Sequence, residues 1–128
     1  MQYLKFFLII LLSVISAKAE FLETQSAQAR KEKKLILVTI ESPTCVYCAK
    51  MKKEIFNAPL RKEIDKKFIV VTFQNDDPRL PPDLVPQYVP ANAILSPVNQ
   101  DVIDAYVGYI EPKRFMEILN NAYASSYK

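Results

Sequence analysis

The stretch that decides the fold is Leu35-Ile36-Leu37-Val38-Thr39-Ile40-Glu41-Ser42-Pro43-Thr44-Cys45-Val46-Tyr47-Cys48. Its first six residues form a continuous apolar run rich in β-branched side chains, which is typical of a central strand buried on both faces. A short link then leads to two cysteines three residues apart, where a helix from about Cys45 to Asn57 is predicted. Cys48, Met51 and Ile55 form the inward stripe of that helix, at spacings of three and four residues. The cysteine pair is therefore expected at a strand-to-helix junction.

The elements around this junction predict an α/β fold with a mixed sheet. Residues 20–34 are polar and rich in helix formers, with cations at the end that favour a helix C-terminus, so they predict a weakly amphipathic helix. Residues 68–73 are a second apolar run, predicted to be a second buried strand. A helical crossover, interrupted at Pro59 and resumed over residues 60–67, separates the two strands, so we expect them to pair in parallel.

The second half of the chain predicts an excursion, a hairpin and a final helix. Residues 75–90 contain five of the nine prolines, so they are expected to hold little regular helix and to form a surface excursion. Residues 91–95 and 102–107 predict an antiparallel hairpin. Pro112 is well placed to open the last helix. Its apolar face is formed by Phe115, Ile118, Leu119, Ala122 and Tyr123. The chain has 128 residues, half of them apolar, which suits one core, and its single glycine excludes a glycine-rich phosphate loop.

The pair Cys45 and Cys48 has the placement of a redox centre. At the start of a helix the sulfur of Cys45 lies near unpaired backbone N–H groups and the positive end of the helix dipole, which both favour the thiolate. Cys45 is therefore the predicted nucleophile. Cys48 lies one turn deeper on the same face and suits the resolving role, in which it attacks a mixed disulfide. Val46 and Tyr47, between the cysteines, are expected to tune the pair and to contact the substrate.

Two other uses of the cysteine pair stay open from the residues alone. One is a structural disulfide, although closing a loop of four residues contributes only about 2 kcal/mol before strain, against about 3 kcal/mol for 15 residues. The other is capture of a soft metal ion such as Cu(I) by the two thiolates. A zinc site needs two further ligands, and the chain has no histidine and no third cysteine. A c-type haem site needs a histidine where Ala49 stands.

The first nineteen residues predict a secretory signal peptide. Lys5 precedes an apolar run from Phe6 to Ile15, and Ala17-Lys18-Ala19 has the A-x-A pattern of a cleavage site. An uncleaved membrane anchor is the alternative, but the run is well short of the ~20 residues that span a bilayer. We expect cleavage after Ala19, a mature domain of residues 20–128 and no stable association with a membrane. Export would place both cysteines in a compartment where disulfides persist.

The small net charge of the predicted mature domain indicates no partner that binds mainly through charge, such as nucleic acid. Removal of the leader takes away two lysines and no acid, which lowers the formal net charge from +3 to +1. A nearly neutral domain with its lysines spread through helical patterns has no basic footprint for nucleic acid or for an anionic membrane surface. Neither is predicted as a partner.

The chain resembles the thioredoxin-like superfamily, in particular the exported thioredoxin-fold proteins of bacteria, over about Leu22 to Tyr123. Three blocks carry the resemblance: Leu37 to Cys48, Tyr88-Val89-Pro90-Ala91, and Gly108 to Phe115. It implies a three-layer α/β sandwich in which helices flank a central mixed sheet. It also implies that Pro90 is the cis-proline that faces the CxxC pair, with the Val89 backbone free to bind an extended substrate strand. Without the resemblance Pro90 would be expected to be trans.

The sequence departs from the family pattern near the cysteines. Pro43 and Thr44 replace the tryptophan common before the first cysteine, and Val89 stands where many relatives carry Thr or Ile. Thr39 occupies the strand position where thioredoxins proper place a buried acid that handles the proton of the resolving thiol. Glu41, on the link to the CxxC pair, is a possible proton acceptor in its place, and a solvated loop carboxylate is the alternative.

The resemblance implies a periplasmic thiol–disulfide oxidoreductase that exchanges disulfides with protein substrates and with a redox partner protein. No dissociable cofactor and no metal are implied beyond the redox-active disulfide, and we expect a monomer. A reductase is the favoured direction. An oxidase or isomerase uses the same chemistry at another redox potential, which the sequence does not supply. A non-enzymatic binding protein, or a copper-capturing protein with a structural disulfide, is the alternative from another class.

Overall fold

The computed structural model of the protein describes residues 21–127, so the predicted leader lies outside the described residues. The order of elements is the predicted one. The helices are α2 (Glu23–Glu32), α3 (Val46–Met51), the π-helix η1 (Lys52–Phe56), α4 (Leu60–Asp65), the 3₁₀-helix η2 (Pro82–Leu84) and α5 (Pro112–Ser126). The strands are β1 (Leu35–Glu41), β2 (Phe68–Gln74), β3 (Ala91–Leu95) and β4 (Val102–Val107). The helix expected over residues 45–57 is thus divided into α3 and η1, and Cys45 precedes its first turn.

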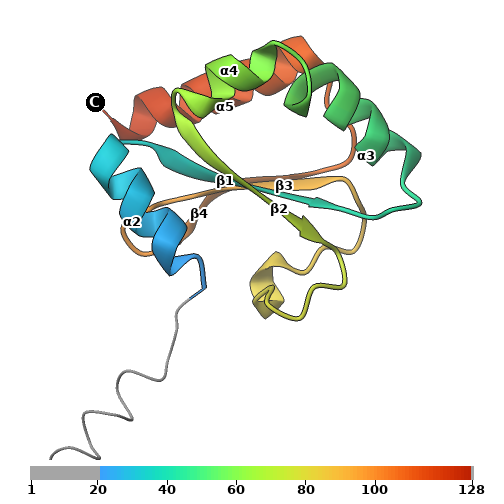
Figure 1. Ribbon diagram of the computed structural model, residues 1–128, viewed down its shortest axis with the longest axis horizontal. Coiled ribbons are helices and arrows are strands. Elements are labelled where there is room, and N and C mark those ends of the chain that lie inside the picture. Colours follow the sequence, from blue (N-terminus) through green and yellow to red (C-terminus); the bar gives the residue numbers. More distant parts are fainter. Residues whose placement is uncertain (1–20, 128) are drawn as a thin grey trace, which may run out of the picture.

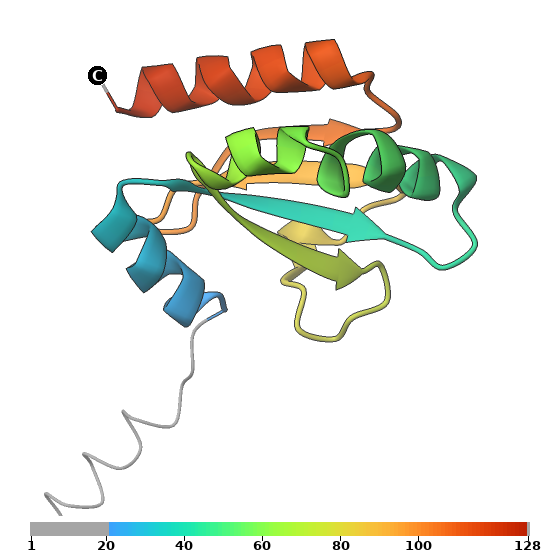
Figure 2. The ribbon, with the colours of Figure 1, turned by 45° about the horizontal axis from the view of Figure 1, so that its top comes forward.

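The four strands form one mixed sheet in the order β2-β1-β3-β4. β1 pairs with β2 in parallel, as the helical crossover predicts, and with β3 in antiparallel fashion. β3 and β4 form the expected antiparallel hairpin. Figures 1 and 2 show α3, α4 and α5 on one face of the sheet, and α2 with the proline-rich excursion on the other. The architecture is therefore the predicted three-layer sandwich.

Alternation along β1 divides the core into two halves. Ile36, Val38 and Ile40 pack on the face of α2, whereas Leu35 and Leu37 pack beneath α3, α4 and α5. The second half is completed by Met51, Ile55, Ile64, Phe115, Ile118 and Leu119. The first six residues of β1 are all buried, as a strand covered on both faces requires. Among residues 21–127, no helix is long and apolar enough to cross a membrane.

The expectation that β2 is a buried strand is wrong. β2 lies at one edge of the sheet, so it has a hydrogen-bonded neighbour on one side only. Only Phe68 and Phe73 are buried, and Thr72 is exposed. Its apolar side chains contact α4 on one face of the sheet and α2 on the other. A strand can have such contacts at an edge as well as in the centre of a sheet.

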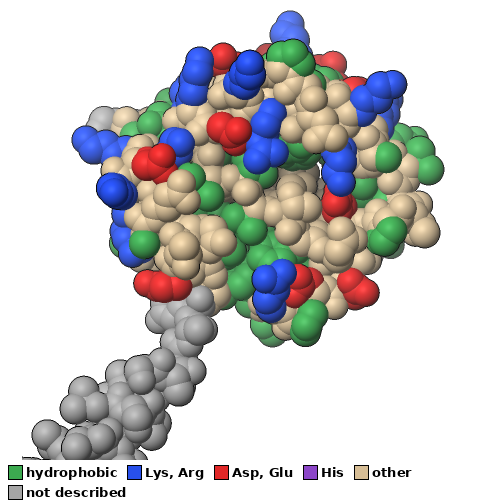
Figure 3. Space-filling model, viewed as in Figure 1, with side chains coloured by type: hydrophobic (Ala, Val, Ile, Leu, Met, Phe, Trp, Pro, Cys, Tyr) green, Lys and Arg blue, Asp and Glu red, His purple; other side chains and the backbone are tan. Residues whose placement is uncertain are grey.

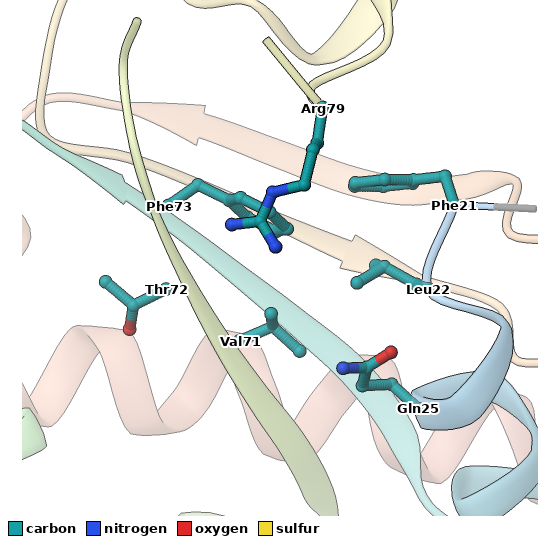
Figure 4. A pocket seen from close by; sticks show the side chains of 7 residues that line it. All are labelled: Phe21, Leu22, Gln25, Val71, Thr72, Phe73 and Arg79. Atoms are coloured by element: carbon teal, nitrogen blue, oxygen red, sulfur yellow. The ribbon is translucent and has the colours of Figure 1, made fainter. Parts of the chain in front are cut away.

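An open groove of about 560 Å³ lies beside this edge strand. We call it the β2 groove, and Figure 4 shows the residues that line it: Phe21, Leu22, Gln25, Val71, Thr72, Phe73 and Arg79. The rings of Phe21 and Phe73 lie with their centroids 5.5 Å apart, and the Arg79 guanidinium lies 5.2 Å from the centroid of Phe73. Arg79 also donates hydrogen bonds to both carboxylate oxygens of Asp77.

The proline-rich excursion is more buried than predicted. It contains only the short helix η2, in agreement with its prolines. However, Leu80 and Leu84 are buried and belong to the core half beneath α2. The segment therefore covers one face of the sheet at the point where it leads into Pro90 and β3.

Candidate active site

Cys45 and Cys48 form a disulfide at the start of α3, with their Cα atoms 5.2 Å apart. Cys45 is the residue that caps the helix: its backbone is extended, at φ −88° and ψ 110°. The Cys45 sulfur accepts a hydrogen bond from the Cys48 backbone N–H at 3.1 Å. This donor is one of the N–H groups that have no partner within the helix. It would stabilise a thiolate on Cys45 in the reduced protein.

The two sulfurs differ in access. Cys45 is half-buried, whereas Cys48 is only 5% exposed. Val46 and Tyr47 point outward, with 78% and 58% of their surface exposed. An incoming thiol or disulfide therefore meets Cys45 and the two intervening side chains, while Cys48 stays behind them.

Of the predicted substrate-binding residues in the second half of the chain, Pro90 lies beside Cys48, and Val89 packs on the core half beneath α2. The Val89–Pro90 peptide bond is cis. Pro90 is buried and shares a small cavity with Cys48. The Pro90 carbonyl accepts a hydrogen bond from the Gly108 N–H at 2.7 Å, which fastens the loop after β4 to this segment. Gly108 has a φ of +99°, a conformation that favours glycine.

The cavity beside Cys48 has a volume of about 20 Å³, and we call it the disulfide cavity. Its lining consists of Thr39, Glu41, Cys48, Met51, Lys52, Phe56, Thr72 and Pro90. It lies on the face of the sheet that α3 covers, and Glu41 and Lys52 are its only charged residues. Among the residues that line the cavity, these two are therefore the candidates for exchanging a proton with Cys48.

Glu41 does not lie on the link, as the sequence suggested, but is the last residue of β1. Its side chain is 16% exposed and accepts a hydrogen bond from the Lys52 ammonium group at 3.0 Å. The Gln74 side-chain amide also donates to it, at 3.4 Å. The alternative of a freely solvated loop carboxylate is thus wrong, because Glu41 is held beside the cavity by two partners.

A buried polar residue was missed by sequence reasoning. Asn92 is 3% exposed, and neither its side-chain oxygen nor its nitrogen has a hydrogen-bond partner. An amide buried without partners costs about 1–3 kcal/mol in proteins. Asn92 is the direct cross-strand neighbour of Thr39, which lines the disulfide cavity. An asparagine inside the apolar run Ala91 to Leu95 was the available signal.

Tyr109 is a second residue that the sequence did not single out. Its ring lies 5.9 Å from that of Tyr47, between centroids, and the Lys50 ammonium group lies 4.5 Å from its centroid. Its hydroxyl donates to the Glu54 carboxylate at 2.6 Å, and this hydrogen bond raises the pKa of Tyr109 to about 12. Tyr109 therefore supports Tyr47 and ties the loop after Gly108 to the helix of the cysteines.

A family model described as thioredoxin-like matches residues 17–97, which include the cysteine pair and Pro90. The chain belongs to the thioredoxin-like family. The match covers β1, the CxxC pair, the crossover, the excursion and β3, so the fold and the strand-to-helix placement of the cysteines are those of the family. A comparison with curated proteins finds no match.

Solved structures give the same fold. The chain is 26% identical to the periplasmic thioredoxin SoxS from Paracoccus pantotrophus, with a TM-score of 0.58 over 73% of this chain and 99% of that one. It is 13% identical to the C-terminal domain of DsbD from Neisseria meningitidis, with a TM-score of 0.61 over 77% and 90%. A disulphide isomerase from Xylella fastidiosa is 18% identical, with a TM-score of 0.56 over 88% and 95%. At these low identities, the last two structures show a shared fold only.

Proposed function

We propose that the protein is an exported thiol–disulfide oxidoreductase that reduces disulfides of other proteins in the periplasm. The observation that carries the proposal is the asymmetry of the cysteine pair. Cys45 is accessible and accepts a backbone N–H, and Cys48 is buried beside Pro90. A disulfide with a purely structural role needs no such difference in access, whereas stepwise exchange does.

In the proposed reaction the reduced protein acts in two displacements. The Cys45 thiolate attacks one sulfur of a substrate disulfide, a mixed disulfide forms, and the other substrate sulfur leaves as a thiolate. Cys48 then gives up its proton, for which Glu41 is the proposed acceptor, and attacks the Cys45 sulfur. The second substrate thiolate leaves, the Cys45–Cys48 disulfide forms, and two electrons have passed to the substrate. A reduced redox partner protein must restore the dithiol, and no further cofactor is needed.

The substrate is proposed to bind as an extended segment beside Pro90. The Val89 backbone would hydrogen-bond to that segment, and the exposed side chains of Val46 and Tyr47 would contact it on the other side of Cys45. Mostly main-chain hydrogen bonds would make binding tolerant of substrate sequence.

The direction and the compartment are supported by two observations. The similar structure at 26% identity is a periplasmic thioredoxin. The first nineteen residues have the pattern of a cleaved leader. We propose that the mature domain works as a monomer.

The proposal is tested by reduction of insulin disulfides in the presence of dithiothreitol. The reduced protein is expected to accelerate the reaction, and the same protein with both cysteines alkylated is the control. Equal rates with the two forms would contradict enzymatic exchange. Equilibration with glutathione then gives the direction: a potential near that of thioredoxin, about −270 mV, supports a reductase, and one near about −120 mV indicates an oxidase instead.

A further inference from the structure

The unpartnered amide of Asn92 lies on the same side of the sheet as the buried cysteine. Asn92 and Thr39 are direct partners in the β1–β3 register, and directly opposed side chains of paired strands lie on the same face. That face is the one beneath α3 and α5, because Ile94 of β3 and Leu37 of β1 belong to the same core half. Thr39 and Cys48 both line the disulfide cavity. The three residues thus form a row from β3 through β1 to the active-site helix.

In the disulfide form this row is incompletely hydrogen-bonded. Both side-chain polar atoms of Asn92 lack a partner. Tyr106, the neighbour of Asn92 on β4, donates its hydroxyl to Asp104 and not to the Asn92 side chain. A disulfide sulfur is a weak acceptor. Reduction converts Cys48 into a thiol or thiolate, and an ionised sulfur is a much stronger one.

We propose that Thr39 and Asn92 form a hydrogen-bond relay that stabilises the reduced form of Cys48. The inference rests on the proposed function. When a thiolate attacks Cys45, the Cys45–Cys48 bond breaks and its electron pair leaves on the Cys48 sulfur. The Thr39 hydroxyl donates to that sulfur, and the Asn92 amide nitrogen donates to the Thr39 oxygen and fixes its orientation. Asn92 is a positioning residue here, since it acts through Thr39.

The relay is expected to shift the redox equilibrium towards the dithiol form. A hydrogen bond present only in the dithiol form makes the disulfide easier to reduce. Neutral donors achieve this without a second negative charge beside Cys48, which a carboxylate at position 39 would add. Glu41, the proposed proton acceptor, has its own charge balanced by Lys52.

The experiment is equilibration of the full-length mature protein with glutathione at pH 7, for the wild type, Asn92→Leu and Thr39→Val. We expect the equilibrium constant for reduction of the disulfide to fall about tenfold in each variant, which corresponds to about 30 mV. The double variant is expected to lose about tenfold rather than a hundredfold, because both changes remove one relay. Thr24→Val, at an exposed position of α2, is the control and should not change the constant.

A purely structural asparagine gives a different result. It would change the stability of the oxidised and reduced proteins equally and leave the equilibrium constant within twofold of the wild type. That outcome in both single variants would overturn the relay. Thr39→Val decides the question alone if Asn92→Leu does not fold, because valine keeps the shape of threonine. A wild type that neither exchanges with glutathione nor reduces insulin would contradict the proposed function, and the two failures are therefore distinguishable.

Discussion

The disulfide cavity and the β2 groove lie on opposite faces of the same edge strand and differ in size and chemistry. The cavity measures about 20 Å³ and is lined by the buried cysteine, the paired Glu41 and Thr39. The groove measures about 560 Å³ and contains two phenylalanine rings and an arginine that is already paired. On the side of the molecule that faces the reader in Figure 3, acidic and basic side chains are interspersed, with no large patch of one sign. The proposed redox site is therefore the smaller of these two hollows.

The two regions differ in their expected roles. Redox chemistry requires an accessible sulfur with a second thiol behind it, and only the cavity side of the sheet has them. At the groove, the contacts of Phe73 with Phe21 and with Arg79 hold the start of α2 and the excursion against β2. Substitutions at the cavity should thus change exchange, and those at the groove should change stability.

The largest expected effect is that of Cys45→Ser. Loss of the accessible sulfur should reduce insulin reduction to the rate of the buffer, because the buried Cys48 cannot replace it. The variant should fold, since a half-buried serine is tolerated at a helix N-cap. Retention of a large part of the activity, measured by insulin precipitation, would show that the first attack does not occur at Cys45.

Phe73→Ala should separate stability from exchange at the groove. The side chain is 4% exposed, and truncation of a buried phenylalanine costs about 3–5 kcal/mol. Urea unfolding should show that loss, while the equilibrium constant with glutathione stays within twofold of the wild type. A tenfold change in the constant would mean that the groove contributes to the redox site.

Glu41→Gln tests the proton acceptor at the cavity. Removal of a positioned base should slow the resolution of a mixed disulfide between Cys45 and glutathione about 100-fold. The profile of rate against pH should also change, because Lys52 would then be the only charged group that lines the cavity. Quenched-flow mass spectrometry measures the rate. Glu63→Gln, an exposed pair partner of Lys66, is the matched control. A profile identical to that of the wild type would remove Glu41 from the mechanism.

The smallest effect is expected at the rim of the groove, for Asp77→Asn. Hydrogen bonds from Arg79 lower the pKa of Asp77 to about 2. The carboxylate is therefore favoured in the folded state, and its stabilisation is present above pH ~4, the ordinary value, and lost as the pH falls towards 2. Thermal midpoints between pH 5 and 2 should fall less steeply in the variant than in the wild type. Asp76→Asn is the control, and an unchanged slope in Asp77→Asn would contradict the assigned pair.

Most of the helices and strands could be predicted, because hydrophobic periodicity and proline positions act over a few neighbouring residues. The apolar run of β1, the prolines of the excursion and the face of α5 each gave the correct element. The edge position of β2 could not be predicted, since an apolar strand packed between helices has the same composition at an edge as in the centre.

The site was predictable only in part. The spacing of Cys45 and Cys48 and the position of Pro90 identified its centre. The Glu41–Lys52 pair, the Tyr47–Tyr109 contact and the Thr39–Asn92 neighbourhood join residues that are far apart in sequence. Their contacts depend on the strand register and on the crossover, which the sequence pattern does not determine to one residue.

In the proposed mechanism Cys45 makes the first attack and Cys48 resolves the mixed disulfide. Incubation of reduced Cys48→Ser and reduced Cys45→Ser with an oxidised protein substrate, followed by non-reducing electrophoresis and mass mapping, tests it directly. Cys48→Ser should accumulate a mixed disulfide through Cys45, and Cys45→Ser should accumulate none. Equal trapping by both variants, or trapping through Cys48 alone, would contradict the account.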